Sequence, residues 1–333
     1  MGKSKKKPAT PESALLVPLH PALKASSSRI PVVDTHCHML STLSFFRAKY
    51  PESDKSSVQD FVRAYFSQSS STHIEGLVDV YCEPPFSGWK DLADSALHDA
   101  EAWSGVKYNY VMGVHPHNAK EYTDEVEAMI LEAMKHPLCV GWGEIGLDYH
   151  YNLSPHDVQE RVLVRQLQHA VRLGKPITIH TREGRVFLRN IWRILRANVP
   201  KEAHLHIHCF TDTPELAQKL LDHFPNCWIG ITGVVTYATN TNTSSVIRNL
   251  VAASPDRTSS VLRLLLETDS PYMTPTTLPT GEMGIKNARS LATCHSGMIP
   301  YTAQFVADTA GNGWTTEDVL RVCRENARRM YGI

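Results

Sequence analysis

The sequence predicts an α/β fold, a (β/α)8 TIM barrel in a single domain. Eight short runs rich in β-branched and other apolar residues recur along the chain, as expected for strands buried in a parallel sheet. Most of these runs precede a stretch with helical periodicity, over a span close to the ~250 residues usual for such barrels. A doubly wound open sheet is the alternative. It is disfavoured because no Gly-x-Gly-x-x-Gly motif follows the first strand.

The predicted strands and helices alternate along the chain. The strands cover residues 30–38, 74–80, 108–114, 139–145, 176–180, 204–209, 228–232 and 262–268. The helices cover residues 91–103, 123–135, 157–173, 186–197, 214–224, 301–310 and 316–331. Helix 157–173 has the clearest boundaries, since Ser154-Pro155 precedes it and Gly174 follows it. Thr315 is likewise typical of a helix start.

Two long segments interrupt this alternation. Residues 41–72 follow the first strand and contain one helix candidate, 59–67, and residues 273–299 follow the last strand. Loops of this length within a compact domain are usually functional lids or insertions. Both segments start at the carboxyl end of a strand, so we expect both at the mouth of the barrel.

The first 28 residues differ in composition from the rest. Residues 3–8 form a short basic run in a context rich in Pro, Ser and Ala. We therefore expect a disordered basic tail over 1–28 and a barrel domain over 29–333. The basic run is either a solvated leader or a nuclear localisation signal. Protein partners through this tail or through residues 41–72 are a further expectation.

The composition excludes some function classes. Hydrophobic residues make up 42% of the 333 residues, which supports a sizeable core. The 34 basic and 34 acidic side chains balance, so binding to a nucleic acid must rest on a local patch. No apolar stretch is long enough to span a bilayer, and the seven scattered cysteines indicate a reducing compartment. We expect a cytoplasmic and/or nuclear protein with no membrane partner.

The first strand ends in a His-x-His motif. In an extended strand, His36 and His38 point to the same side and Cys37 points away. Two neighbouring imidazoles pack poorly but suit borderline cations such as zinc. Two satisfied polar side chains are the alternative interpretation of this pair.

Other strands also end in potential ligands. The complete set comprises four imidazoles and two carboxylates: His36, His38, Glu144, His180, His208 and Asp269. Active sites of barrel enzymes lie at the carboxyl ends of the strands. Six ligands are too many for one tetrahedral ion and suit two divalent ions, which Glu144 could bridge. Asp269 could bind a metal and also accept a proton from the attacking water. Alternatively, Glu144 is a turn residue and Asp269 caps a helix.

Six motifs of the chain resemble, in the same order, those of the TatD family of metal-dependent deoxyribonucleases. They are VDTHCH (33–38), GVHPH (113–117), GEIGLDY (143–149), IHTR (179–182), HCF (208–210) and ETDSPY (267–272). The resemblance covers about residues 31–333 and is similar to fungal members. It implies a metal-dependent-hydrolase barrel that cleaves DNA phosphodiesters, often from the 3′ end. The six ligands correspond to the family's, with Glu144 and Asp269 as the catalytic residues.

Three further residues are predicted to contact the substrate. Arg182 could bind a phosphate as a fork donor, or could form a buried ion pair. His115 and His117 could touch substrate, support the metals or simply pack. The chain departs from the family where Met39-Leu40 follows the His-x-His motif and where residues 274–290 replace an Arg- and Asn-containing stretch. These departures concern substrate choice more than metal binding.

The sequence leaves the metal and the substrate open. The cofactors are expected to be Mg²⁺, Mn²⁺ or Zn²⁺, since imidazoles favour zinc or manganese and phosphoryl chemistry often uses magnesium. DNA is the expected substrate. The alternatives are a hydrolase of a small phosphoester or of another ester or amide, and a barrel that serves mainly as a protein-binding scaffold.

Overall fold

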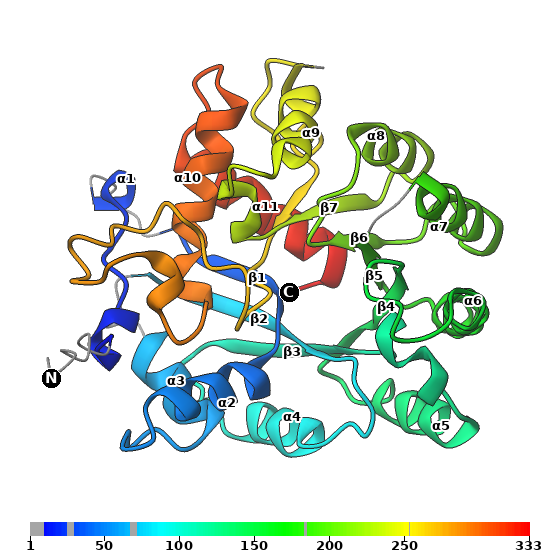
Figure 1. Ribbon diagram of the computed structural model, residues 1–333, viewed down its shortest axis with the longest axis horizontal. Helices are drawn as coiled ribbons and strands as arrows, with labels where there is room; N and C mark the ends of the chain where they lie inside the picture. The colour runs from blue at the N-terminus through cyan, green and yellow to red at the C-terminus, as the bar shows by residue number, and fades with distance from the viewer. Residues whose placement is uncertain (1–9, 25–29, 67–71, 183–184, 253) are drawn as a thin grey trace, which may run out of the picture.

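The computed structural model describes residues 10–24, 30–66, 72–182, 185–252 and 254–333. Eight parallel strands lie side by side in chain order, and helices surround them (Figure 1). The strands are β1 Val32–Cys37, β2 Ile74–Tyr81, β3 Lys107–Met112, β4 Cys139–Asp148, β5 Ile177–Arg182, β6 Leu205–His208, β7 Cys227–Ile231 and β8 Leu264–Leu266. The predicted (β/α)8 barrel is confirmed.

The barrel closes just beyond the end of β8. Cys37 forms a parallel bridge with Ser270, whose carbonyl accepts the His38 N–H at 2.8 Å. The Asp269 N–H donates to the His36 carbonyl at 2.9 Å. This junction between β1 and the end of β8 is here called the seam. Buried Asp34 stabilises it by accepting a hydrogen bond from the Thr268 hydroxyl at 2.6 Å. The closure therefore brings the two ends of the strand sequence together at one point of the mouth.

The helices form a ring around the strands. They are α2 Met39–Lys49, α3 Val58–Tyr65, α4 Trp89–His98, α5 Asp124–Ala133, α6 His156–Arg172, α7 Arg185–Asn198, α8 Pro214–His223, α9 Thr241–Ala252, α10 Ile299–Ala310 and α11 Thr316–Tyr331. The seven predicted helices are all present. Gly174 ends α6 with a positive φ of 62°, and Thr315 starts α11 in a capping box with Asp318.

Helix α11 lies across the amino ends of the strands. Arg324 of α11 binds Glu75 at the start of β2, and Tyr331 packs with Val33, Val111 and other buried strand residues. The C-terminus accordingly lies near the centre of the ring in Figure 1. The opposite end of the barrel, at the strand carboxyl ends, is left for the functional site.

Two helices of the ring, α2 and α9, are absent from the sequence-based prediction. In the 41–72 segment, α3 corresponds to the predicted helix candidate 59–67, but α2, which starts directly after the His-x-His motif, was not predicted. No side chain caps α2, so the sequence carries no start signal for it. Helix α9 is rich in Thr, Asn and Ser, which are weak helix formers, and burial of Val246, Ile247 and Val251 overrides this propensity. The 273–299 segment holds only the short turns η4 Ala288–Ser290 and η5 Ser296–Met298.

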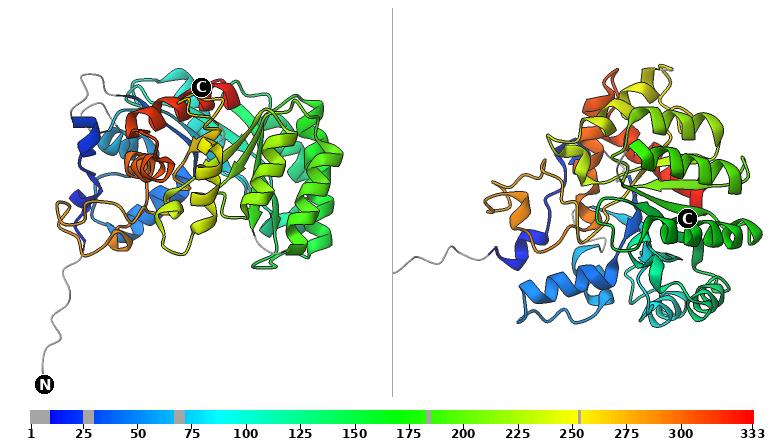
Figure 2. Two further views of the ribbon diagram at one scale, coloured as in Figure 1. Left: turned by 90° about the horizontal axis from the view of Figure 1, so that it is seen from above. Right: turned by 45° about the vertical axis from the view of Figure 1, so that its right-hand side comes forward.

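The prediction of a disordered tail over 1–28 is wrong for residues 10–24. This part forms η1 Glu12–Leu15 and α1 Pro21–Lys24 and runs beside the 273–299 segment (Figures 1 and 2). Leu15, Val17 and Leu23 are buried in the main core, and the His295 ring donates to the Leu15 carbonyl at 2.9 Å. Burial of these apolar side chains offsets the entropy of ordering the segment. The basic run at 3–8 lies outside the described residues.

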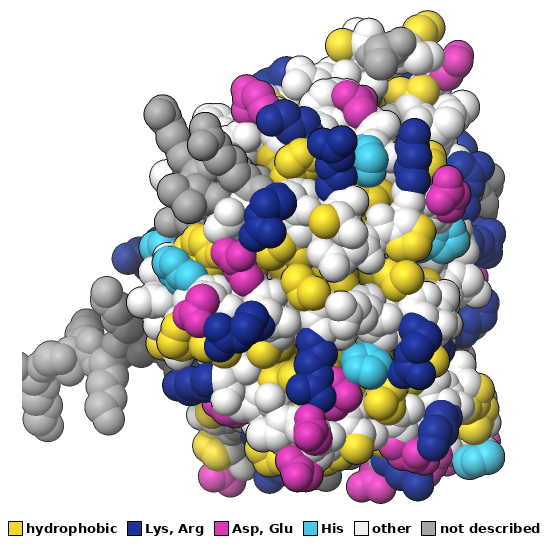
Figure 3. Space-filling view, turned by 90° about the vertical axis from the view of Figure 1, so that its right-hand side faces the viewer, with side chains coloured by type: hydrophobic (Ala, Val, Ile, Leu, Met, Phe, Trp, Pro, Cys, Tyr) yellow, Lys and Arg dark blue, Asp and Glu magenta, His cyan; other side chains and the backbone are white. Residues whose placement is uncertain are grey.

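The surface formed by α6 and α7 has no large patch of side chains that all carry the same charge (Figure 3). Basic and acidic side chains alternate there with histidines and small apolar groups (Figure 3). None of the helices in the described part of the chain combines the length and apolarity needed to cross a membrane.

Glu75 provides a stability test of the α11 contact. Arg324 holds the pKa of Glu75 at about 2, assisted by Lys107 and Arg328. This lies below the ~4.3 of an unfolded chain, so the ion pair stabilises the fold above that pH and loses its effect as the pH falls toward 2. We expect Glu75→Gln to lower the free energy of unfolding by about 1 kcal/mol at pH 7, because the pair is partly solvated.

Urea unfolding of Glu75→Gln between pH 2.5 and 7 measures this contribution. The difference from the wild type should shrink steadily below pH 4. Glu52→Gln is the control, since Glu52 is exposed and forms no ion pair with a described residue. A deficit that is the same at all pH values would contradict the assignment.

Candidate metal centre

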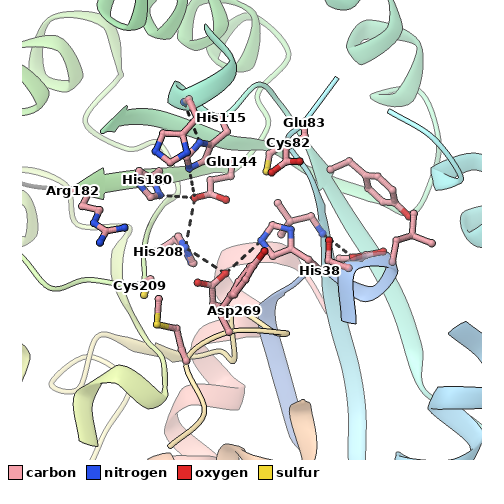
Figure 4. A pocket seen from close by; sticks show the side chains of 18 of the residues that line it. His38, Cys82, Glu83, His115, Glu144, His180, Arg182, His208, Cys209 and Asp269 are labelled. Carbon is pink, nitrogen blue, oxygen red and sulfur yellow. Dashed lines mark hydrogen bonds and ion pairs between the residues drawn. The ribbon is translucent and has the colours of Figure 1, made fainter. Parts of the chain in front are cut away.

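The carboxyl ends of the strands surround a cavity of about 710 Å³. Eight of the nine predicted site residues line it: His38, His115, His117, Glu144, His180, Arg182, His208 and Asp269. Figure 4 labels all of these except His117. The ninth, His36, is fully buried against His208 and Glu144. The fold thus brings together all the residues that the sequence placed at one mouth.

His36 is the most deeply buried member of the site. Its ring stacks on that of His208 with the centroids 3.5 Å apart. Neither ring nitrogen has a hydrogen-bond partner among the described residues, although Nε2 lies 3.4 Å from Glu144 Oε2 and 3.8 Å from Asp269 Oδ1. Burial, together with the facing His208, lowers the pKa of His36 to about 4. A buried, neutral and unsatisfied imidazole fits a metal ligand.

Glu144 lies at the centre of the imidazoles. Its Oε1 is 2.7 Å from His180 Nδ1, 3.5 Å from His208 Nε2 and 3.6 Å from His115 Nε2, while Oε2 faces His36. Burial opposes ionisation, but the surrounding imidazoles hold the pKa of Glu144 well below its usual range. The two oxygens face different ligand sets, as in a carboxylate that bridges two cations.

Asp269 follows β8 with a left-handed backbone, φ = 52°. Asp is among the few non-glycine residues that adopt this region readily. The conformation, together with the hydrogen bond to His36, carries the carboxylate into the cavity. Its Oδ1 lies 3.4 Å from His38 Nε2 and 3.9 Å from His208 Nε2.

Three overlapping groups of side chains could each hold a cation. In each group the ligand atoms lie within 4.8 Å of one another. The groups are His36, His208 and Asp269; His36, His38 and Glu144; and His115, Glu144 and His180. Two of them share Glu144 and no other residue. The donor set therefore fits metal ions on both sides of that carboxylate.

Asp148, to which the sequence analysis assigned no role, also contacts the site histidines. Its buried Oδ2 lies 2.8 Å from His117 Nε2 and 3.3 Å from His180 Nε2. His180 is thus held between two carboxylates. Burial lowers its pKa, but Asp148 and Glu144 outweigh this effect and raise the pKa to about 9. Asp148 thereby orients both rings toward the cavity.

Glu267 contacts the Nδ1 side of the His208 ring, opposite the Nε2 atom. Its Oε1 accepts the Cys209 N–H at 2.6 Å and lies 3.2 Å from His208 Nδ1. Its Oε2 lies 2.8 Å from His206 Nε2, and His206 Nδ1 in turn meets the Tyr331 hydroxyl at 2.8 Å. Burial opposes protonation of His208, but Glu267 and the cavity carboxylates raise the pKa of this ring to about 10. These contacts present His208 Nε2 to the cavity.

Gly230 of β7 makes room for this arrangement. A Cβ atom at this position would lie 2.5 Å from both Glu267 Oε1 and His206 Nε2. Only glycine allows the strand to pass this close to the pair. The sequence signal for Glu267 was its place in the ETD motif, but its partners lie on β6 and directly after it, so they depend on the fold.

Arg182 ends β5 at the rim of the cavity. Its guanidinium carbon lies 4.7 Å from the centroid of the Tyr151 ring, and it forms no ion pair with a described residue. Figure 4 shows Arg182 beside His180 and His208, across the cavity from His38. The alternative of a buried ion pair is therefore not seen among the described side chains.

A barrel whose mouth gathers imidazoles and carboxylates in this way defines a metal-dependent hydrolase. The family model described as TatD related DNase matches residues 33–332. The chain belongs to this TatD family, as the motifs predicted.

Named relatives fall in the same family. The chain is 30% identical over 308 residues to the human "3'-5' RNA nuclease TATDN2". This alignment covers 90% of this chain and 35% of the human protein. The chain therefore spans about a third of that relative's length. It is 32% identical over 241 residues to the "3'-5' ssDNA/RNA exonuclease TatD" of Musicola paradisiaca, covering 72% of this chain and 81% of that protein.

Solved structures share the fold. An uncharacterized amidohydrolase from Saccharomyces cerevisiae superposes with a TM-score of 0.66 at 16% identity, covering 90% of this chain and all of that one. The TatD homolog YJJV from Escherichia coli gives a TM-score of 0.64 at 16% identity, covering 92% and 100%. At this identity the likeness concerns the architecture alone.

Glu267→Gln tests the support of His208. The amide can keep one acceptor but turns an N–H toward the neighbouring donors, so His208 should lose its orientation. We expect metal affinity to fall about 10- to 100-fold, as for other residues that orient a ligand. Calorimetric titration of the metal-free protein with Mn²⁺ measures the change.

Glu202→Gln serves as the matched control, since Glu202 is exposed at the other end of the barrel. Melting temperatures of both variants check that they fold. Wild-type Mn²⁺ affinity in a folded Glu267→Gln variant would refute the role of Glu267.

Proposed function

We propose that this protein is a metal-dependent phosphodiesterase that removes nucleotides from the 3′ end of single-stranded DNA. The observation that carries the proposal is the convergence of imidazoles from both sides on the buried carboxylate of Glu144. Family membership and the nuclease names of the relatives support the same reaction class.

Two divalent cations suit the donor set. His36, His38 and Asp269 would hold one of them, and His115 or His208 with His180 would hold the other, with Glu144 shared. Divalent cations at such a centre polarise phosphoryl oxygens and make water easier to deprotonate. The imidazole-rich set favours Zn²⁺ or Mn²⁺, and Mg²⁺ is the alternative that phosphoryl transfer often uses.

The chain's own residues supply the remaining chemistry. Asp269 accepts a proton from the water that attacks the phosphorus, and its position beside His38 and His208 holds it at the centre of the cavity. Arg182 binds a non-bridging phosphate oxygen, since its guanidinium is unpaired among the described residues and reaches the rim. The new P–O bond forms as the bond to the 3′ oxygen breaks.

Other expectations accompany this proposal. Three expectations from the sequence stay predictions: a barrel domain over 29–333, a cytoplasmic or nuclear location, and protein partners at residues 1–28 or 41–72. The firm docking of residues 10–24 suggests that any partner would meet this segment as part of the folded surface.

Release of nucleotides from 3′-labelled single-stranded DNA tests the proposal. Glu144→Gln and Asp269→Asn should each lower kcat/KM by at least about 100-fold in Mg²⁺, Mn²⁺ or Zn²⁺, because each change removes a carboxylate at the reaction centre. Chelation should abolish release by the wild type. If the folded, metal-loaded wild type releases nothing, DNA is not the substrate and small phosphoesters are next to be assayed.

Arg182→Lys separates charge from geometry. Lysine keeps the positive charge but loses the planar fork, so we expect kcat/KM on DNA to fall about 10-fold, and further in Arg182→Ala. Arg248→Ala is the control, since Arg248 is exposed on α9 and forms no ion pair with a described residue. Equal activity of Arg182→Ala and the wild type would exclude the phosphate contact.

A further inference from the structure

Two exposed tyrosines flank the candidate metal centre. Tyr151 follows β4 and Tyr272 follows β8, and both line the cavity although their side chains are half exposed. We propose that each ring stacks on one of the two nucleobases that flank the cleaved phosphodiester. This inference rests on the proposed nuclease function and adds the residues that receive the bases.

Tyr272 is fixed close to the reaction centre. It lies three residues after Asp269, and its N–H donates to the Asp269 carbonyl at 2.9 Å. The ring is 48% exposed and meets Phe45 of α2 in an edge-to-face contact, with the centroids 5.7 Å apart. Phe45 is itself 45% exposed. Helix α2 thus extends an apolar, aromatic rim on this side of the cavity.

Tyr151 forms the second platform. The ring is 53% exposed and packs on the edge of His117 at 5.6 Å, with the Arg182 guanidinium 4.7 Å from its centroid. Its N–H donates to Asp148 Oδ1 at 3.2 Å. The same carboxylate orients His117 and His180, so the platform is tied to the candidate ligands.

The two platforms lie on opposite sides of the mouth. In an eight-stranded barrel that runs in chain order, β4 and β8 are diametrically opposed. The shared carboxylate, Glu144, lies between His180 near Tyr151 and Asp269 near Tyr272. A phosphodiester held at the centre would direct one nucleoside toward each tyrosine.

The charges of the cavity favour stacking as the source of affinity. Arg182 is the one Lys or Arg among the described residues that line it, whereas four carboxylates do so: Asp79, Glu83, Glu144 and Asp269. The protein therefore contributes few phosphate contacts. Aromatic rings bind bases through their faces regardless of sequence, which suits an enzyme that removes successive nucleotides. Neither tyrosine hydroxyl has a hydrogen bond among the described side chains, which leaves the ring as the functional part.

Abasic substrates test the proposal on the intact, metal-loaded enzyme. Single-stranded 3′-labelled oligonucleotides carry a normal base or an abasic site at the last or the next-to-last position. Tyr272→Ala and Tyr151→Ala should each raise KM about 5- to 150-fold on the normal substrate, the range for loss of one stacked base. Removal of the corresponding base should raise the wild-type KM by a similar factor and leave that of the matching variant almost unchanged.

The Phe variants at both positions should recover most of what the Ala variants lose. Leu153→Ala is the control for an exposed apolar side chain, since Leu153 is 54% exposed and does not line the cavity. Wild-type KM should also rise with salt concentration no more steeply than one or two phosphate contacts allow, a log–log slope of about 0.7 per contact.

The outcomes separate the two proposals. No release by the folded wild type from any oligonucleotide would overturn the nuclease function itself. Release by the wild type with unchanged KM in both Ala variants would overturn the stacking role alone. A variant that stays as sensitive to base removal as the wild type would also overturn it, since the ring and the base would then act independently.

Discussion

The structure depends on one buried carboxylate surrounded by imidazoles. Glu144 is removed from water, and four histidines from four different strand ends face its two oxygens. Placing such a charge in the interior is favourable only with close partners of opposite sign or with bound cations. The barrel meets this requirement by directing the ends of β1, β3, β5 and β6 toward Glu144 on β4. Asp148 and Glu267 then fix the outer faces of the rings.

The seam between β1 and β8 links this centre to the closure of the barrel. The hydrogen bonds that join His36 to Asp269 and His38 to Ser270 are backbone contacts of the fold and also set the spacing of three candidate ligands. A change that loosened the seam would therefore alter the site before it altered the helices. The closure of the barrel and the geometry of the site thus depend on the same backbone bonds.

Much of this could be predicted from the sequence, for reasons that are local. Buried parallel strands are nearly continuous apolar runs, so their positions were found within a few residues, and the potential ligands stood at the ends of these runs. Helix α2 and the docked segment 10–24 were missed because tertiary burial, not capping or periodicity, orders them. Asp148, Glu267 and His206 received no role because the side chains that they contact in the site are 31 to 125 residues away along the chain. Their roles depend on long-range contacts, which cannot be predicted from the spacing of residues in the sequence.

Because Tyr331 lies near the end of the described chain, the support of His208 forms only after most of the chain has been synthesised. Tyr331 ends the row of polar contacts that runs from His208 through Glu267 and His206, and it lies on helix α11. His36 emerges from the ribosome nearly three hundred residues earlier, yet the support of the centre is incomplete until α11 is free to pack. Contacts this distant in sequence form late in folding. A nascent chain would thus carry its histidines without an assembled centre until α11 has been synthesised and has packed.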